Sequence, residues 1–413
     1  MIRLSVPRNS IVMPYKNYIG IKSLFYFCPL PLRLDSYRGC AFGCLYCFSH
    51  SLNNRNYDFF KVSDIADPTH FNRLLDRIIS GKNNINTGIL NDFIRKRIPF
   101  HFGTTSDPLQ PIELSEGVTF ELLSILDRYN YPFVLSTKSA LIGEQKYYSF
   151  FLKKGTAIQI SFSTLDDDLA SIIEPNAPSP SNRLKLLSLL SQKGIWCIAR
   201  IQPYLYPYDT NLERILLAIS QTGVKSIILE HLRIPTNSKQ SQRVKLWQAL
   251  GMNVIDEYNS MGIKYSRVNY ELKSELKMKN IRIAQDFCKS HNIQFCSGDN
   301  DFHHISDSVC CCGLDCGDKS FNLYDSNLMK GIRNGLKMKT IDFNYIYTDW
   351  QPNSSISEHI NSQCRINKKH KIIDFLEKKI DTPSSSNSPA SFYGIEYKHN
   401  EYHVNFDLLK DLL

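Results

Sequence analysis

Three cysteines near the start of the chain, Cys40, Cys44 and Cys47, have a spacing suited to iron–sulfur chemistry. They lie in the segment DSYRGCAFGCLYCFSHS, a C-x3-C-x2-C pattern directly after a predicted strand. Three thiolates on one tight loop can ligate three irons of a [4Fe–4S] cluster and leave the fourth iron open to chelate a small molecule. The glycine before each of the first two cysteines would let the backbone approach the cluster closely, and the Tyr46 ring would form a wall for an adenine.

This loop has two alternative interpretations, a structural zinc site or three unrelated thiols. Zinc usually takes four ligands, often as two C-x2-C pairs, and no second pair lies nearby. The spacing, with an aromatic residue before the last cysteine and a strand before the loop, therefore favours an iron–sulfur cluster.

A second group of cysteines lies in the stretch QFCSGDNDFHHISDSVCCCGLDCG. Its members are Cys296, Cys310, Cys311, Cys312 and Cys316. Because neighbouring side chains diverge, three consecutive cysteines cannot easily all face one metal; the first cysteine, two of the trio and the last one form a reasonable set. Such a site would hold an auxiliary iron–sulfur cluster or a structural zinc. A vicinal disulfide or free thiols is the alternative, and the two histidines between them are interpreted as hydrogen-bonded loop residues.

The composition indicates a globular cytoplasmic protein. No window holds the roughly 18 apolar residues that a membrane helix needs, and the first residues, MIRLSVPRNS, lack the apolar core of a secretory signal. We therefore expect no contact with a membrane. In a reducing compartment, twelve cysteines indicate metal binding or redox chemistry rather than disulfides. Four of them stand apart and are interpreted as small core residues: Cys28, Cys197, Cys288 and Cys364.

The net charge of +9 is spread along the chain rather than gathered in one run. It permits contact with a polyanion without requiring it.

Between about residues 30 and 300, short apolar runs alternate with amphipathic stretches. The predicted strands are 31–36, 98–105, 132–137, 157–164, 196–203 and 226–232, and helical patterns occupy 121–129, 182–194 and 211–223. Gly194 and Gly223 fit helix C-caps. This alternation predicts βαβ units and a parallel sheet, either an open doubly wound sheet or a partial barrel. In both architectures reactive residues gather at the C-terminal ends of the strands.

We divide the chain into four parts. An N-terminal extension, 1–30, precedes the strand–helix domain, 31–292; a cysteine-rich, metal-binding segment, 293–320, follows, and a small accessory region, 321–413, ends the chain. The accessory region includes a basic KKHK, a loop-like TPSSSNSPAS, an alternating aromatic stretch and a final helix-like DLLKDLL.

Several motifs taken in order resemble the radical SAM superfamily, and more closely its branch related to spore photoproduct lyase. The resemblance runs from about Leu32 to Leu232 and rests on YRGCAFGCLYC, GTTSDPLQPIE, LSTKS, ISFST, EPNAPSP with Arg183, and IQP. It implies a partial (β/α)6 barrel of the TIM type, with a [4Fe–4S] cluster and S-adenosylmethionine (SAM) as cofactors. It also implies an electron donor, either a reductase or a flavodoxin or ferredoxin.

The resemblance further implies SAM contacts at successive strand ends. Lys138 would pair with the SAM carboxylate, and Ser106 and Asp107 match a Ser-Asp pair that contacts SAM. Ends of the fourth and fifth strands supply further candidates: Ser161, Ser163, Arg200 and Gln202. Taken singly, each would be an ordinary strand-end residue, or a helix N-cap for Ser106 and Asp107. Their repetition at successive strand ends favours a binding site.

The predicted activity is reductive cleavage of SAM to a 5′-deoxyadenosyl radical, which abstracts hydrogen from a substrate. The enzyme would be of lyase or transferase type, acting on a nucleic acid in lesion repair or modification. One alternative keeps the chemistry and changes the substrate to a peptide or small metabolite. Another is a non-catalytic, metal-dependent nucleic-acid-binding protein, against which Lys138, Asp107 and the strand-end serines argue.

One position departs from the family pattern. In spore photoproduct lyase a hydrogen-donating cysteine begins a Cys-Thr-Ser-Asp run, whereas this chain reads Thr104-Thr105-Ser106-Asp107. We therefore expect that the protein is not a spore photoproduct lyase in the strict sense.

Overall fold

The central feature of the fold is one large, mostly parallel sheet. In this computed structural model the described residues are 13–15, 17–22, 27–49, 61–81, 89–262, 264–265, 269–314, 321–325, 327–338, 340–341, 395–398 and 401–404. The sheet has eight strands among these residues, in the order β14-β10-β9-β8-β7-β6-β3-β2. Their bounds are β2 Ile19–Ile21, β3 Leu32–Leu34, β6 Phe100–Phe102, β7 Phe133–Thr137, β8 Thr156–Phe162, β9 Cys197–Tyr204, β10 Ser226–His231 and β14 Gln294–Ser297.

The strand order identifies the type of sheet. Every neighbouring pair from β3 to β14 is parallel, and β2 pairs antiparallel with β3. The strands β3 to β10 in this sheet lie side by side in chain order with no reversal, as in a barrel and not as in a doubly wound sheet. The prediction of an α/β fold with a parallel sheet is confirmed, and all six predicted strands are present. β14, at the start of the predicted cysteine-rich segment, adds a further parallel strand.

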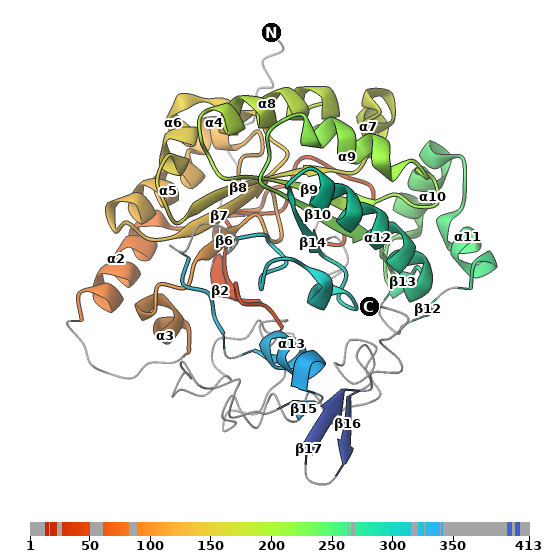
Figure 1. The fold of residues 1–413 in the computed structure, drawn as a ribbon. Coiled ribbons are helices and arrows are strands. Elements are labelled where there is room, and N and C mark those ends of the chain that lie inside the picture. Colours follow the sequence, from red (N-terminus) through yellow and green to blue (C-terminus); the bar gives the residue numbers. More distant parts are fainter. Residues whose placement is uncertain are drawn as a thin grey trace.

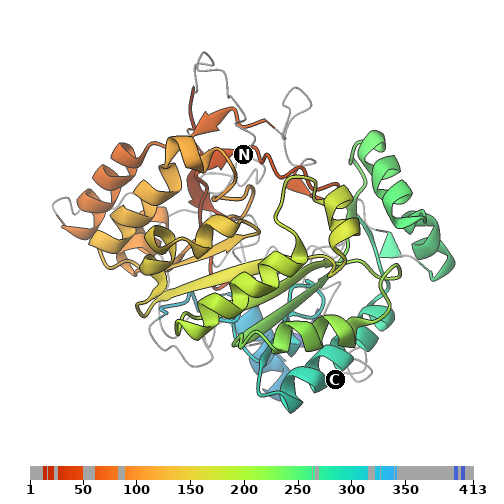
Figure 2. The same ribbon diagram turned by 90° about the horizontal axis from the view of Figure 1, so that it is seen from above.

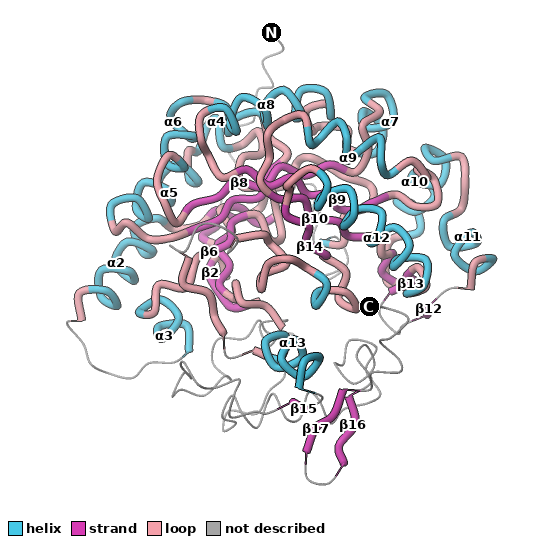
Figure 3. The backbone as a smooth tube through the Cα atoms, in the orientation of Figure 1, coloured by secondary structure: helices cyan, strands magenta, loops and turns pink. Residues whose placement is uncertain are grey.

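Helices cover one face of this sheet. The helices α5, α8 and α9 lie over β7 to β10 in Figure 1, and Figure 3, in the same orientation, shows the helices as an outer arc around an inner arc of strands. Seen from above, helices lie across the strands of the sheet (Figure 2). The helix bounds are α2 Pro68–Ile79, α3 Ile89–Arg95, α4 Glu113–Glu116, α5 Val118–Arg128, α6 Gln145–Tyr148, α7 Asp167–Ile173, α8 Pro180–Gln192, α9 Leu212–Ser220, α10 Gln240–Leu250, α11 Val254–Ser260, α12 Ser274–Ser290 and α13 Leu328–Met338.

Local sequence explains where α8 begins and ends. The Ser179 hydroxyl accepts a hydrogen bond from the Asn182 amide at 3.3 Å, and Pro180 occupies the first turn, where its missing N–H costs nothing. Gly194 follows the helix with φ +77°, a left-handed conformation that suits glycine. Gly223, with φ +79°, plays the same part after α9, so both predicted C-cap glycines are confirmed.

Side chains alternate between the two faces of the sheet. On β7, Phe133 and Leu135 belong to the large core that contains the residues of α5, α8 and α9, whereas Val134 belongs to a separate core without residues of those helices. The second core therefore lies on the inner face of the arc. Its strand residues are Val134, Ala157, Ile198, Ile228 and Cys296.

The inner face changes character along the strands. The residues two positions further along β7, β8, β9 and β10 are polar: Ser136, Gln159, Arg200 and Glu230. Toward the carboxyl ends follow Lys138, Ser161 and Gln202 on the same face. The inner face thus runs from an apolar, cysteine-containing end to a polar end where the strands finish.

Smaller sheets lie outside this core. They are β1 (Met13–Pro14), β5 (Asp64–Ile65) and β4 (Tyr37–Arg38); β11 (Ile234–Pro235), β13 (Asn269–Glu271) and β12 (Lys264–Tyr265); and β15 (Thr340–Ile341), β17 (Glu401–Val404) and β16 (Ile395–Lys398). Within the alternating aromatic stretch, β16 and β17 pair antiparallel. The KKHK, TPSSSNSPAS and DLLKDLL segments lie outside the described residues. Among described residues, no helix has both the length and the apolar character needed to cross a membrane.

Candidate functional site

The loop that carries Cys40, Cys44 and Cys47 is anchored on one side by Gln110. The Gln110 side chain donates to the Gly39 carbonyl at 2.9 Å and accepts from the Ala41 amide at 2.7 Å. The loop turns through Gly39 and Gly43, whose φ values of +96° and +69° favour glycine. The GTTSDPLQPIE motif therefore fixes the course of the cysteine loop.

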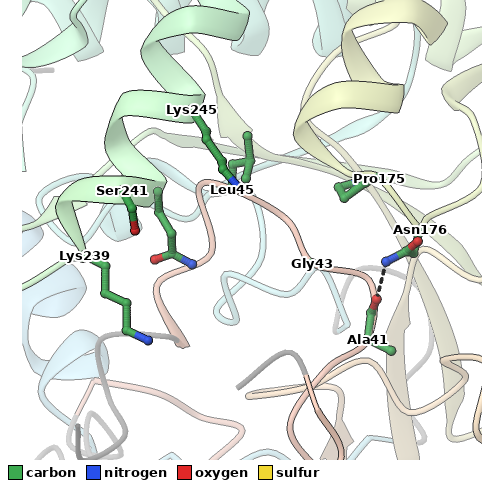
Figure 4. Close-up of a pocket in the computed structure, with 9 residues that line it drawn as sticks. Ala41, Gly43, Leu45, Pro175, Asn176, Lys239, Ser241 and Lys245 are labelled. Atoms are coloured by element: carbon green, nitrogen blue, oxygen red, sulfur yellow. Dashed lines mark hydrogen bonds between the residues drawn. The ribbon is translucent and has the colours of Figure 1, made fainter. Parts of the chain in front are cut away.

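The EPNAPSP motif holds the other side of the loop. The Asn176 side chain donates to the Ala41 carbonyl at 2.8 Å (Figure 4), and its backbone amide donates to the Phe42 carbonyl at 3.3 Å. The Leu45 amide donates to the Ile173 carbonyl at 2.9 Å. Three motifs that are far apart in the sequence thus meet at one loop beyond the carboxyl ends of the strands.

The donor set of this loop fits an iron–sulfur cluster. Cys40, Cys44 and Cys47 are half-buried cysteines close enough to interact electrostatically with one another. Burial, followed by the nearby Asp107 carboxylate, raises the pKa of Cys40 to about 12. Across the described part of the chain, no three His, Cys, Asp or Glu side chains stand together as a preformed metal site. The cluster therefore stays a prediction from the residue types and their spacing.

Several polar groups beside the loop gather around Glu174. We call Glu174 and its partners Tyr46, Ser163, Arg183 and Lys138 the hub. Its carboxylate, fully buried, accepts hydrogen bonds from the Tyr46 hydroxyl, from the Ser163 hydroxyl at 2.7 Å and from the Arg183 guanidinium. Burial raises the pKa of Glu174, but the Arg183 and Lys138 charges and these hydrogen bonds outweigh it and lower the pKa overall. The carboxylate is therefore ionised and positions Tyr46 of the cysteine loop.

Lys138 belongs to the same hub, and its ammonium group can still bind another partner. Its ammonium nitrogen is 3.9 Å from Glu174 Oε1 and 5.7 Å from the centre of the Tyr46 ring. The Lys138 side chain is 13% exposed, so its charge is largely shielded from solvent. Because Glu174 already accepts bonds from three other groups, the lysine ammonium can bind a further carboxylate. This is the role predicted for it toward SAM.

Asp107 links the second and third strand ends. Its two carboxylate oxygens accept from the Lys138 amide at 2.7 Å and from the Thr137 hydroxyl at 2.7 Å. Burial raises its pKa, against the hydrogen bonds that lower it. Asp107 therefore orients the backbone of Lys138, and its predicted contact with SAM stays a prediction.

The three predicted serines differ in their surroundings. The Ser106 hydroxyl donates to the Tyr37 carbonyl at 2.6 Å, next to the cysteine loop. Ser163 donates to Glu174, as described above, and the Ser161 carbonyl accepts from Arg183 at 2.5 Å. Ser161 and Ser163 therefore lie beside the Glu174–Arg183 pair, whereas Ser106 lies beside Tyr37; the hydroxyls of Ser106 and Ser163 already have protein acceptors.

Arg200 and Gln202 belong to a different network, on the inner face of the arc. Arg200 donates to the Ser136 hydroxyl at 3.0 Å and to Gln159 Oε1 at 3.1 Å, and it also contacts Gln202. Gln202 in turn donates to Glu230. Their hydrogen bonds do not connect them to Glu174 or Lys138, so the structure places them beside the hub's network and not within it.

The second cysteine group lies at the opposite end of the inner face. Cys296, Cys310 and Cys312 are buried in the inner core with Ala157 and Ile198, near the amino ends of the strands. The Cys312 carbonyl accepts from Gln159 at 3.2 Å, and the Gly313 carbonyl accepts from Trp196 at 3.2 Å. This segment therefore closes the amino end of the barrel, and Cys316 lies outside the described residues.

Cys28 joins this group, although it stands apart in the sequence. It packs against the same core, and its thiol interacts electrostatically with Cys311 and Cys312. The thiols of the consecutive trio also interact with one another. Cys28 thus packs against a core, as predicted, but it does not stand apart from the other cysteines, because the chain entering β3 passes beside the trio.

Sequence reasoning assigned no site role to four residues that build the site: Gln110, Glu174, Asn176 and Arg183. Each belongs to a motif that was noted, but only the fold shows that Gln110 and Asn176 clamp the cysteine loop. The available signal for Glu174 was its place in the EPNAPSP motif close to Arg183, since a buried carboxylate needs a nearby cation.

Comparison with known proteins finds distant relatives of unassigned function. The chain matches no known protein-family profile. It is 23% identical over 215 residues to an uncharacterized protein of Mycobacterium tuberculosis (50% of this chain, 60% of that protein). It is 24% identical over 226 residues to an uncharacterized protein of Acidianus two-tailed virus (51% of this chain, 70% of that protein). The match spans about three fifths of the mycobacterial relative.

Solved structures of two radical SAM enzymes are similar to this chain. Spore photoproduct lyase with bound AdoMet and dinucleoside spore photoproduct has a TM-score of 0.46 and 13% identity, covering 69% of this chain and 78% of that chain. SuiB of Streptococcus suis bound to S-adenosylmethionine has a TM-score of 0.41 and 14% identity, covering 66% of this chain and 51% of that chain. Since both TM-scores lie below 0.5, the function proposed below rests on the chain's own residues.

Proposed function

We propose that this chain is a radical SAM enzyme in which Cys40, Cys44 and Cys47 hold a [4Fe–4S] cluster. One observation carries the proposal: the C-x3-C-x2-C loop is clamped beside the Lys138–Glu174 hub, beyond the carboxyl ends of parallel strands. When bound and reduced, the cluster supplies one electron that cleaves the C5′–S bond of SAM and yields a 5′-deoxyadenosyl radical.

The residues of the hub would bind and orient SAM. Lys138 would pair with the SAM carboxylate, because its ammonium is largely shielded from water and faces the loop side chain Tyr46. Glu174 keeps Tyr46 in place, and Asp107 keeps the end of β7 in place. The buried position of Glu174 and Arg183 also limits the access of water to this end of the barrel.

The proposed substrate is a nucleic acid, and a peptide or small metabolite is the alternative. The net charge of +9 supports the first, as do the hydrogen-bonding groups of Gln159, Arg200 and Gln202 on the inner face. The two similar enzymes were solved with a dinucleoside and with a precursor peptide, so the fold does not choose between them. Crosslinking of the protein to cellular nucleic acid would distinguish the two classes.

We also propose a second metal site at the amino end of the barrel. The proximity of Cys28 to Cys310, Cys311 and Cys312 supports it, since thiols are ligands of zinc and of iron–sulfur clusters, although the four are not preformed as a metal site. In barrels of this type, residues at the amino ends of the strands contribute to stability and those at the carboxyl ends to catalysis. The position of this site at the amino end therefore indicates a structural role.

Anaerobic incubation with SAM and dithionite, followed by measurement of 5′-deoxyadenosine, tests the enzymatic proposal. Reconstituted protein should form 5′-deoxyadenosine and show sulfide-to-iron charge-transfer absorbance. Replacing Cys40, Cys44 or Cys47 by alanine should abolish both. Full cleavage activity in any of these variants would refute the cluster assignment, and no cleavage by the wild type would favour a non-catalytic binding protein.

A further inference from the structure

A pocket of about 400 Å³ lies against the cysteine loop. Ala41, Gly43 and Leu45 form one wall, and Lys239 and Lys245 lie on the opposite side (Figure 4). Lys239 precedes α10, and Lys245 lies within it and reaches toward Leu45. The pocket thus borders residues that lie between the cysteines along the loop.

This pocket is separate from the predicted SAM site. None of the residues predicted to contact SAM lines it. Lys138 and Glu174 approach the loop through Tyr46, whereas Ala41, bonded to Asn176, faces the pocket. Because its lining shares no residue with the predicted SAM site, we assign the pocket a role other than holding the substrate for hydrogen abstraction.

The pocket is positively charged. Lys239 and Lys245 are exposed, and no salt bridge to either is present among the described residues. The lining includes no acidic side chain, and α10 contains Arg243 and Lys245 but no aspartate or glutamate. On the same helix Val244 is 42% exposed, which adds an apolar contact beside the charges. Such a surface complements an acidic protein with an apolar centre.

We propose that this pocket and the exposed side of α10 are the docking site for an acidic one-electron carrier protein. This inference rests on the proposed function, because a [4Fe–4S] cluster on the loop must receive an electron from outside the protein. Electron transfer slows steeply with distance, and the pocket wall is made of residues directly adjacent to Cys40 and Cys44. The carrier is oxidised by one electron and the cluster is reduced by one, so the step balances without a further reactant.

Binding of a reduced flavodoxin to the full-length protein tests the proposal. The double variant Lys239→Glu/Lys245→Glu should bind it about tenfold or more weakly than the wild type, and the difference should shrink in high salt. The control Lys154→Glu/Lys185→Glu carries the same change of net charge at two exposed lysines elsewhere and should bind normally. Equal binding by the wild type and the Lys239/Lys245 variant would overturn the proposal.

Two further measurements separate this inference from the proposed function. Cleavage of SAM driven by dithionite should be the same in the Lys239/Lys245 variant and the wild type, whereas cleavage driven by reduced flavodoxin should fall. If dithionite drives no cleavage in the wild type, the proposed function fails, and the binding measurement still judges the docking site. If the variant loses affinity for an oligonucleotide and keeps it for flavodoxin, the pocket binds nucleic acid and the proposal is wrong.

Discussion

The ammonium nitrogen of Lys138 lies 3.9 Å from Glu174 Oε1, while Arg183 holds the other oxygen of the same carboxylate. One buried anion thus faces two cations. Arg183 is fully buried and fixed by a second bond to the Ser161 carbonyl, so it is committed to the protein. Lys138 is the more loosely held cation, and this difference makes it the residue available to a bound carboxylate.

Replacing Lys138 with glutamine should weaken the binding of SAM. The variant keeps the backbone amide bonded to Asp107 but removes a charge-assisted hydrogen bond, which is worth about 1.5–3 kcal/mol, or roughly 10- to 150-fold in Kd. Equilibrium dialysis of anaerobically reconstituted protein measures this change. Lys185→Gln, the same change at an exposed position of α8, should leave Kd unaltered. An unchanged Kd in the Lys138 variant would remove this residue from the SAM site.

The Glu174→Gln variant should be strongly destabilised at neutral pH. It leaves Arg183 buried without a countercharge, and breaking a buried ion pair costs about 3–5 kcal/mol of the free energy of unfolding. Urea unfolding measures the change, and Glu121→Gln on the exposed side of α5 is the matched control. A loss no larger than that of the control would show that Glu174 does not organise the hub.

The difference in the free energy of unfolding between the wild type and Glu174→Gln should depend on pH, with a sign that the pKa of Glu174 fixes. The pKa of Glu174 is lowered in the folded protein, so its stabilising contribution is present above the ordinary glutamate value of 4.5 and is lost as the pH falls through the lowered value. The stability difference between wild type and Glu174→Gln should therefore narrow in acid. A difference that is as large at pH 3 as at pH 7 would contradict this.

The sequence was sufficient for the parts of this structure that depend on local pattern. The six strands follow from apolar runs bounded by turn residues, and Gly194 and Gly223 end helices because only glycine readily takes their conformation. The pairing of Glu174 with Tyr46 could not be predicted, since it joins residues 128 positions apart. The proximity of Cys28 to the trio could not be predicted for the same reason, because Cys311 and Cys312 lie far from it in the sequence.

Metal analysis of two variants tests the second site. With Cys40, Cys44 and Cys47 all replaced by alanine, the protein should still retain zinc or iron. Adding Cys28→Ser should remove that metal, because the thiol lies close enough to Cys311 and Cys312 to interact with them electrostatically. Adding Cys197→Ser, a buried cysteine of β9 in the outer core, should not. A triple variant that holds neither metal would instead identify the second group as free or oxidised thiols.

Thr104 occupies the position where spore photoproduct lyase has its hydrogen-donating cysteine, and this difference predicts a loss of repair activity. Repair of the spore photoproduct must return a hydrogen atom to a product radical, and spore photoproduct lyase, which this chain resembles, uses a cysteine thiol at the matching position because its S–H bond is weak. Here the Thr104 hydroxyl donates to Asp35 at 3.2 Å, and its O–H bond is much too strong to replace a thiol. The protein should therefore cleave SAM without efficient repair of the thymine photoproduct.

The other cysteines do not supply the missing donor. The second group lies with Ala157, four residues before Ser161 on β8, which corresponds to about 13 Å at roughly 3.3 Å per residue. A thiol at that depth cannot reach a radical formed beside Lys138 without a chain of intermediate donors. Repair of a spore-photoproduct dinucleotide should thus be absent or limited to a single turnover in the wild type, and Thr104→Cys is the variant in which a gain of turnover is expected. Multiple-turnover repair by the wild type would show that a donor other than a thiol at this position suffices.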